Sequence, residues 1–234
     1  PHLKLAREIT RLELGQREAQ ERLGKVPVIG LTGTGGAGKS SLTDELVRRF
    51  LNDFPEKRIA VICVDPTKRK TGGALLGDRI RFNTLRSDRV YFRSLATRGA
   101  QGELSEALDG VVALVEAEGF DLILIETAGI GQGDSSIVRH VDLPAYVMTA
   151  EYGAPSQLEK IEMLDYAKLI VINKYARRGS QDALRDVRKQ FQRNTQRFGD
   201  APASLPVFGT CAANFNDPGV DAVFGNLIAQ LNGS

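Results

Sequence analysis

Short, continuous runs of apolar residues recur along the chain, and stretches with apolar positions every three or four residues separate them. Continuous runs are typical of strands that are buried on both faces of a parallel sheet, whereas half-exposed strands alternate. The helical stretches between the runs can supply the crossovers that parallel strands need. The pattern therefore predicts an α/β fold in three layers, with a mostly parallel central sheet and helices on both faces.

The individual elements follow from these two patterns. Strands are expected at residues 26–31, 57–64, 90–95, 120–125, 146–149, 168–172 and 205–208. Helices are expected at residues 2–23, 39–52, 103–118, 157–164, 181–196 and 220–231. The first helix stands apart from the α/β pattern, so we interpret residues 1–25 as an N-terminal linker helix and residues 26–234 as one domain. This helix either docks another unit or packs on the sheet, and the sequence leaves both alternatives open.

Composition and charge narrow the class of protein. Hydrophobic residues make up 42% and charged residues 26% of the 234 residues, which is ordinary for a globular protein. The net charge of +2 gives no electrostatic reason to expect a nucleic acid or a membrane as partner. No apolar run approaches the roughly 20 residues of a membrane span, and no secretory signal is visible, so a cytoplasmic location is expected. The two cysteines, Cys63 and Cys211, are expected to be reduced thiols in the core.

The strongest motif is GTGGAGKS, residues 33–40, which matches the phosphate-loop pattern GxxxxGK[ST] at every fixed position. Glycines let the backbone curl so that its N–H groups point at phosphate oxygens. Lys39 would contact the β- and γ-phosphates, the Ser40 hydroxyl would bind Mg²⁺, and the helix beginning near Lys39 would turn its positive end toward the anion. The residues expected to bind nucleotide here are Gly33, Gly35, Gly36, Ala37, Gly38, Lys39, Ser40 and Ser41. A glycine-rich turn that binds nothing is the weaker alternative, and the fold predicted is that of a P-loop NTPase.

Polar residues or glycine follow four of the expected strands, namely Gly33, Asp65, Glu126 and Asn173. The carboxyl ends of parallel strands meet at one edge of the sheet, where ligands bind. Glu126 ends an intensely apolar run and is expected to reach Mg²⁺ directly or through water. Asp65 and the nearby Asp78 are expected to complete the magnesium shell or to orient the attacking water.

Plainer roles compete with two of these assignments. Asp65 could be a turn residue before a proline, and Asp78 could cap a helix that begins there. Catalytic roles are assigned to Lys39, Asp65 and Glu126. Gly129 is expected to let a backbone N–H approach the γ-phosphate, and residues 65–78 and 126–134 are expected to change conformation with the bound nucleotide.

The stretch Asn173-Lys174-Tyr175-Ala176 resembles the NKxD loop with which GTP-binding proteins read guanine. In that loop the Asn braces the backbone, the Lys stem packs on the purine and the Asp accepts two hydrogen bonds. Here Ala176 replaces the carboxylate. Asn173 and Lys174 are nevertheless expected to contact the base, together with backbone N–H groups of Cys211 and Ala212 after the last strand. A simple strand-ending turn is the alternative.

Five segments together resemble the MeaB/ArgK family of metallochaperone GTPases: GTGGAGKSS, VDPTKRKTGGALLGDRIRF, SLATRGAQGELSEAL, ETAGIGQGDSS and VINKYARRGSQDALRDVRKQ. Within that family, RRGSQDALRDVRKQ and GTCAANFNDPGV are most similar to the G-domains of fused isobutyryl-CoA mutases. The similarity extends from about Val26 to the end of the chain.

The resemblance implies a Mg²⁺-dependent domain that binds GTP and GDP and hydrolyses GTP. It implies that this domain gates the loading of adenosylcobalamin into an acyl-CoA mutase and protects that mutase. Adenosylcobalamin would sit on the partner mutase domains, which belong to the same parent chain, and a homodimer is compatible. The family's magnesium ligands correspond to Ser40, Asp65, Asp78 and Glu126.

Two other functions stay open at the level of the sequence. One is a P-loop ATPase or kinase, which the missing carboxylate at Ala176 would suit. The other is a module that senses nucleotide with little turnover and signals through its conformation. Turnover of nucleotide with and without the mutase domains separates that module from a regulatory GTPase.

Overall fold

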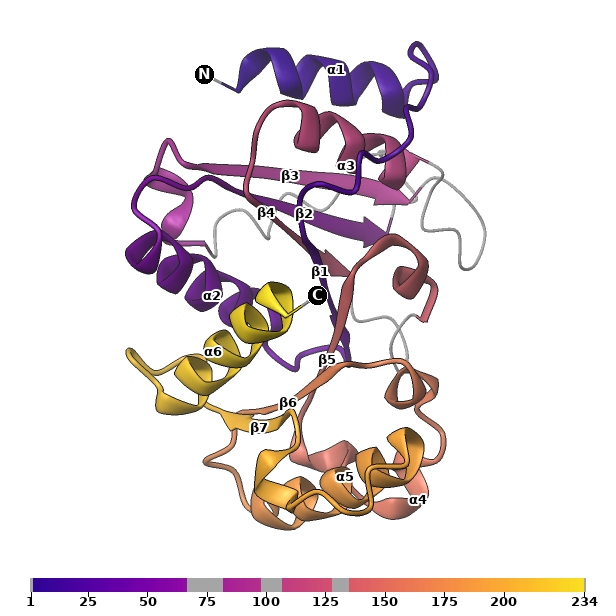
Figure 1. Ribbon diagram of the computed structural model, residues 1–234, viewed down its shortest axis with the longest axis vertical. Coiled ribbons are helices and arrows are strands. Elements are labelled where there is room, and N and C mark those ends of the chain that lie inside the picture. Colours follow the sequence, from indigo (N-terminus) through magenta and orange to yellow (C-terminus); the bar gives the residue numbers. More distant parts are fainter. Residues whose placement is uncertain (1, 67–81, 98–106, 128–134, 234) are drawn as a thin grey trace.

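The computed structural model describes residues 2–66, 82–97, 107–127 and 135–233 (Figure 1). Within them, seven strands form one parallel sheet in the order β3-β2-β4-β1-β5-β6-β7. The strands are β1 Val28–Gly33, β2 Ile59–Pro66, β3 Val90–Thr97, β4 Leu122–Thr127, β5 Leu143–Met148, β6 Leu169–Asn173 and β7 Val207–Thr210. The helices are α1 Leu3–Glu13, α2 Lys39–Asp53, α3 Ala107–Ala117, α4 Pro155–Leu158, α5 Ser180–Thr195 and α6 Pro218–Asn232. The predicted three-layer arrangement is therefore present.

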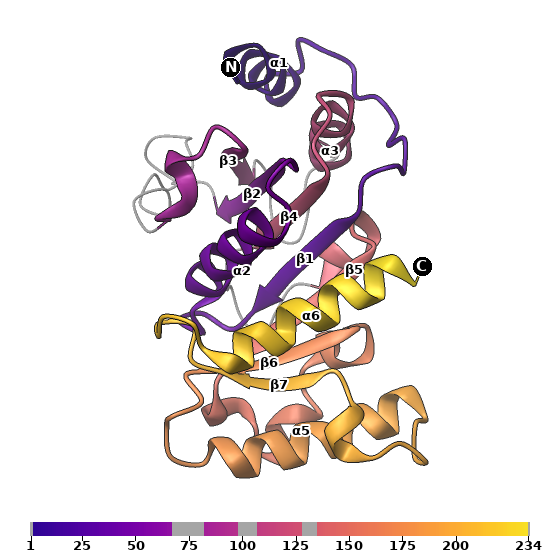
Figure 2. The same cartoon turned by 60° about the vertical axis from the view of Figure 1, so that its left-hand side comes forward.

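Two hydrophobic clusters, one on each face of the sheet, explain why the strand sequences are continuously apolar. Along β1, Val28 points into the cluster with α1, α3, α4 and α5, and Ile29 and Leu31 point into the cluster with α2 and α6. Successive residues of a strand face opposite sides, so every position must be apolar when both sides are covered. Figure 2 shows α2 and α6 lying side by side across one face.

The N-terminal helix is shorter than expected. It ends at Glu13 instead of residue 23, because Gly15 adopts a left-handed conformation with φ of +68° and its N–H bonds to the carbonyl of Leu12. A glycine in this conformation is a common way to end a helix. Leu5, Ile9 and Leu12 are buried against α3 in a shared cluster, so α1 packs on that helix (Figure 1).

Two other elements have bounds that differ from those expected. The helix expected at residues 157–164 is split into α4 and a 3-10 turn, Glu162–Asp165, because Ile161 between them is extended. Strand β5 begins at Leu143 and not at residue 146. Pro144 lies inside this central strand, although proline normally argues against that position. A 3-10 turn at Ser135–His140 was not expected at all.

Candidate functional site

The phosphate-loop motif follows β1 directly and has the backbone that its glycines allow. Gly33 has φ of +148°, and a Cβ there would lie 1.8 Å from the carbonyl oxygen of Val147 in the neighbouring strand. Gly36 and Gly38 are left-handed, with φ of +72° and +86°. Gly38 is the N-cap of α2 and, as a glycine, has no side chain that could cap this helix. The positive end of α2 faces the loop.

Lys39, the first residue of α2, folds back over the loop. Its ammonium group donates hydrogen bonds to the carbonyl oxygens of Gly33 and Thr34, both at 3.1 Å. The residue is only 6% exposed. A buried cation held by two carbonyls is thus placed within the loop expected to hold phosphates.

Ser40, Thr43 and Glu126 form a compact group of oxygen atoms beside the loop. The Ser40 hydroxyl donates to Glu126 Oε1 at 2.7 Å, and Thr43 Oγ1 lies 2.9 Å from Glu126 Oε2. Glu126 is 7% exposed and lies within β4, one residue before its end. Hydroxyl and carboxylate oxygens are the ligands that Mg²⁺ prefers. Thr43 was missed, although its place three residues after Ser40 on one helical face was a usable signal.

The other expected carboxylates are only partly described. The backbone of Asp65 lies near the end of β2, two residues beyond Cys63, which is in register with Glu126. Asp65 and Glu126 therefore belong to adjacent strands, and both residues lie near the carboxyl ends of those strands. The side chain of Asp65, the residues Asp78 and Gly129, and most of the two expected switch stretches lie outside the described residues.

Asn173, the last residue of β6, joins the phosphate loop to the loop after β7. Its amide donates to the carbonyl of Ala37 at 2.8 Å. Its side-chain oxygen accepts from the Thr210 hydroxyl and from the backbone N–H of Ala212, both at 3.0 Å. With 3% of its surface exposed, this side chain is a buried bracket between three segments that are distant in sequence.

Lys174 follows in a left-handed conformation with φ of +58°. Its ammonium group donates to the carbonyl of Gly36 at 2.6 Å, so the lysine stem extends from the end of β6 to the phosphate loop. Both expected base-contacting residues of this stretch, Asn173 and Lys174, thus contact the loop that is expected to hold the phosphates.

A cavity of about 350 Å³ lies between these segments. Its walls are Gly38, Ser41, Asn173, Lys174, Ala176, Arg177, Cys211, Ala212, Ala213 and Asn214, and none of these residues is acidic. The N–H of Cys211 donates to Asp217 Oδ2 at 3.1 Å, and that of Ala212 is bonded to Asn173. Cys211 and Ala212 therefore line the cavity, but the two N–H groups expected to face a base are bonded within the protein.

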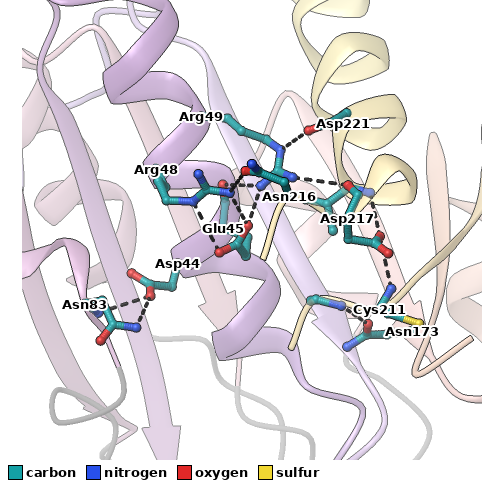
Figure 3. Close-up of polar contacts among 12 residues, drawn as sticks. Asp44, Glu45, Arg48, Arg49, Asn83, Asn173, Cys211, Asn216, Asp217 and Asp221 are labelled. Carbon is teal, nitrogen blue, oxygen red and sulfur yellow. Dashed lines mark hydrogen bonds and ion pairs between the residues drawn. The ribbon is translucent and has the colours of Figure 1, made fainter. Parts of the chain in front are cut away.

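A polar network next to this cavity was not expected from the sequence (Figure 3). Arg48 of α2 contacts Asn216, and Arg49 contacts Asp217 and Asp221, around the beginning of α6. Both arginines also bond to Glu45 of their own helix. Burial raises the pKa of Glu45, but hydrogen bonds from Arg48 and Arg49 outweigh it and lower that pKa below its ordinary value. The hydrogen bond to Glu45 raises the pKa of Arg48. Both groups therefore stay charged near neutral pH.

Asp44 forms a second unexpected contact on α2. Its carboxylate accepts hydrogen bonds from the backbone N–H and amide of Asn83 and from the backbone N–H and hydroxyl of Thr84. These contacts, at 2.7–3.1 Å, fasten the residues before β3 to the helix that begins at the phosphate loop (Figure 3).

The two cysteines were expected to be reduced thiols in the core. Cys63 is buried and Cys211 partly buried, and neither forms a disulfide among the described residues. His140 lies 2.7 Å from Asp109, and His2 stacks near Tyr91. In the described ranges, no three His, Cys, Asp or Glu side chains are grouped as a metal site, and no helix could cross a membrane.

Comparison with known proteins agrees with the motifs. The family model described as "Methylmalonyl Co-A mutase-associated GTPase MeaB" matches residues 6–229. The chain is 61% identical over 208 residues to the fused isobutyryl-CoA mutase of Geobacillus kaustophilus, covering 89% of this chain and 19% of that protein. It is 37% identical over 151 residues to the GTPase ArgK of Escherichia coli, covering 62% of this chain and 44% of that protein. The chain thus spans about a fifth of the length of the fused relatives.

Solved structures agree on the fold. A LAO/AO transport system kinase superposes with a TM-score of 0.60 at 22% identity, covering 98% of this chain and 75% of that one. The hydrogenase maturation factor HypB of Archaeoglobus fulgidus also gives 0.60, at 18% identity, covering 97% of this chain and 98% of that one. The three-layer P-loop fold is confirmed. The family match favours a GTPase over the kinase and the low-turnover module.

Proposed function

Because the chain belongs to the MeaB family of mutase-associated GTPases, we propose that it binds Mg²⁺ and GTP at the site described above and gates cofactor loading of an acyl-CoA mutase. The observation that carries this proposal is the bracket formed by Asn173. One side chain contacts Ala37 in the phosphate loop and Ala212 in the wall of the cavity. Phosphates on the loop would therefore lie next to a cavity of suitable size for the nucleoside.

The phosphate end of the site would hold the anion through backbone N–H groups. Residues Gly33, Gly35, Gly36, Ala37, Gly38, Ser40 and Ser41 would supply the loop and the first turn of α2. Lys39 would exchange its bonds to two carbonyls for bonds to the β- and γ-phosphate oxygens, which are stronger because both partners are charged.

The residues beside the loop suit Mg²⁺. The Ser40 hydroxyl and a Glu126 carboxylate oxygen lie 2.7 Å apart, and both would be ligands of the metal or of its bound water. Asp65 and Asp78 are further ligands in our proposal, and Gly129 would give a backbone N–H to the γ-phosphate. Bound Mg²⁺ would neutralise charge that develops on the phosphates during transfer to water. The contribution of the chain itself is to hold the phosphates and the metal in place.

The base would occupy the cavity, with Asn173 and Lys174 on one side and Cys211 and Ala212 on the other. Because Ala176 provides no carboxylate, we expect the guanine edge to be read weakly. GTP should therefore be preferred over ATP only modestly.

The partner would be an adenosylcobalamin-dependent acyl-CoA mutase. The fused relatives carry a name that includes this activity, and the adenosylcobalamin would be bound by the mutase domains and not by this chain. GTP binding and hydrolysis would gate cofactor loading and protect the mutase. Such a partner is compatible with the cytoplasmic location expected from the sequence and with a homodimer.

Calorimetric titration of this chain with GTP, GDP and ATP, each with Mg²⁺ and with a chelator, tests the site. We expect GTP and GDP to bind, and Mg²⁺ to strengthen GTP binding. Release of phosphate from GTP, measured with and without the mutase domains of a fused relative, then tests the regulatory role. A chain that binds none of the three nucleotides would contradict the proposal.

A further inference from the structure

We propose that Asp217 and Arg49 are positioning residues that hold one wall of the nucleoside cavity in place. Neither residue lines the cavity. The inference rests on the proposed function, because it concerns the share of nucleotide affinity that the nucleoside contributes. It assigns a role to two residues that the sequence analysis did not single out as part of the site.

The wall in question is the loop between β7 and α6, residues 211–217. Cys211, Ala212, Ala213 and Asn214 of this loop line the cavity, opposite Gly38 and Ser41 at the start of α2. The loop has no regular secondary structure beyond tight turns. Its shape therefore depends on individual hydrogen bonds, both within the loop and to neighbouring elements.

Asp217 closes the loop on itself. Its Oδ2 accepts the backbone N–H of Cys211 at 3.1 Å and that of Val220 at 3.0 Å. The second bond caps α6, as Asp commonly does at the start of a helix. The first bond is not needed for capping, and it ties the beginning of the loop to its end (Figure 3).

Arg49 fastens this closed loop to α2. The residue is 6% exposed, and its Nη2 donates to the backbone carbonyl of Asp217 at 3.2 Å. Its other nitrogens donate to Asp221 Oδ1 at 2.6 Å and to Glu45 Oε2 at 2.5 Å. A planar guanidinium can serve three acceptors in fixed directions, which a lysine cannot do.

The two residues therefore link the two ends of the nucleotide site. Helix α2 begins at Lys39 in the phosphate loop, and three turns later it carries Arg49. Through Arg49 and Asp217 the wall is held at a fixed distance from the phosphates. Loss of this link should weaken contacts to the nucleoside and leave contacts to the phosphates as they are.

A purely structural role makes a different prediction. If Asp217 only caps α6 and Arg49 only joins two helices, their loss lowers the melting temperature and affects all ligands alike. The experiment must therefore compare a complete nucleotide with its phosphate part.

The test is calorimetric titration of the chain with Mg²⁺-GTP and with Mg²⁺-tripolyphosphate, which has no nucleoside. We expect Asp217→Ala to lower GTP affinity about tenfold, because a charged hydrogen bond is lost, and to change tripolyphosphate affinity less than about twofold. Asp217→Asn keeps an oxygen acceptor for both N–H groups and should restore most of the GTP affinity. Arg49→Lys should shift the GTP to tripolyphosphate ratio in the same direction by a smaller factor.

Asp217→Gly provides a second variant in case the alanine variant folds poorly, because glycine is tolerated at the start of a helix. Asp221→Ala is the matched control, since it removes another carboxylate partner of Arg49 without touching residues 211–217. It should leave the ratio unchanged.

Equal losses for GTP and tripolyphosphate, or an unchanged ratio in the alanine and glycine variants, would overturn this inference while the proposed function stands. A parent chain that binds tripolyphosphate but not GTP, or neither ligand, would overturn the proposed function and this inference with it.

Discussion

The two ends of the proposed nucleotide site, a phosphate end and a base end, are built in different ways. At the phosphate end, β1, the loop and the first turns of α2 are consecutive in sequence, and Glu126 from the adjacent β4 completes the group. At the base end, the end of β6, the loop after β7 and the third turn of α2 meet from distant parts of the chain. The first end depends on local backbone geometry, and the second depends on long-range contacts.

The two ends also differ in how completely they match the motifs of nucleotide-binding proteins. Every fixed position of the phosphate loop is present, and Gly33 sits where a Cβ would clash with Val147. At the base end, Ala176 stands where a carboxylate would read guanine. We therefore expect the phosphates to contribute the larger share of the affinity for nucleotide and the base the smaller share.

Replacing Lys39 with alanine should give the largest effect. The change removes the cation from the phosphate loop, and charge-assisted contacts of this kind contribute about 1.5–3 kcal/mol each. Affinity for nucleoside triphosphates should fall at least tenfold and approach a hundredfold by calorimetry. Lys57→Ala, an exposed lysine that lies over Phe54, is the control. If the Lys39→Ala variant bound nucleotide as tightly as the parent chain, residues 33–40 would not be the phosphate-binding loop.

Replacing Glu126 with alanine should affect turnover more than binding. The phosphates are still held by backbone N–H groups, but the metal loses a ligand or an outer-shell partner, which typically costs about 10–100-fold. Phosphate release under saturating GTP should fall by this factor, and GTP affinity should fall less. Glu56→Ala at the surface is the control. If the Glu126→Ala variant hydrolysed GTP as fast as the parent chain, Glu126 would not belong to the catalytic site.

Replacing Ala176 with aspartate tests the base end directly. The new carboxylate would accept two hydrogen bonds from guanine, whereas adenine would leave it unsatisfied. GTP affinity should rise at least tenfold, since charge-assisted hydrogen bonds contribute about 1.5–3 kcal/mol each and part of this is lost to hydration. ATP affinity should stay the same or fall. Ala176→Asn, which offers one weaker acceptor, should give a smaller rise.

The measurement is a four-way titration of both nucleotides against both proteins. A ratio of GTP to ATP affinity that stays the same after Ala176→Asp would show that residues 173–176 are not the base-reading loop. The guanine part of the site would then need another location.

The smallest effect is expected at Arg177, which lines the cavity and pairs with Glu151 at 2.6 Å. Hydrogen bonds from Thr149 and from the backbone of Glu151, with a further contribution from Arg177, lower the pKa of the Glu151 carboxyl to about 2. Because both side chains are about half exposed, Arg177→Gln should lower the free energy of unfolding by less than about 1 kcal/mol.

The sign of the pH dependence follows from the lowered pKa. The stabilisation by ionised Glu151 is fully present above the ordinary carboxyl pKa of 4.5 and is lost as the pH falls toward 2. Urea unfolding at pH 7 should therefore separate parent and Arg177→Gln, and at pH 2.5 the difference should shrink. A difference that is the same at both pH values would argue against the pair.

Sequence patterns predicted the parts that local geometry decides. The apolar runs predicted the seven strands and the order of the elements, and the glycine spacing predicted the phosphate loop. Asn173 was also found, because it ends a strand within a familiar motif. In each case the signal lies within a few residues of the feature itself.

Sequence patterns missed the features that distant contacts decide. The sequence analysis assigned no role to Arg49 or Asp217, because only the packing of α6 against α2 brings them together. Pro144 argued against the beginning of β5, but the pairing of this strand with both neighbours overrides that preference. Helix α1 ends at Glu13, just before the left-handed Gly15, instead of at residue 23, which shows that one such glycine outweighs a continuing apolar pattern.

The strand order has a consequence for local opening of the molecule. β1 lies in the middle of the sheet with strands on both sides, whereas β7 lies at an edge and, among the described strands, pairs only with β6. Edge elements open at a lower free-energy cost than central ones, so amide protons of β7 should exchange with solvent sooner than those of β1. A nucleotide that contacts both the phosphate end and the base end of the site would bind only while β7 is paired with β6. It would therefore slow amide exchange in β7 more than in β1. Bound nucleotide would then keep β7 paired with β6, and release of the nucleotide would let this edge of the sheet open independently of the other strands.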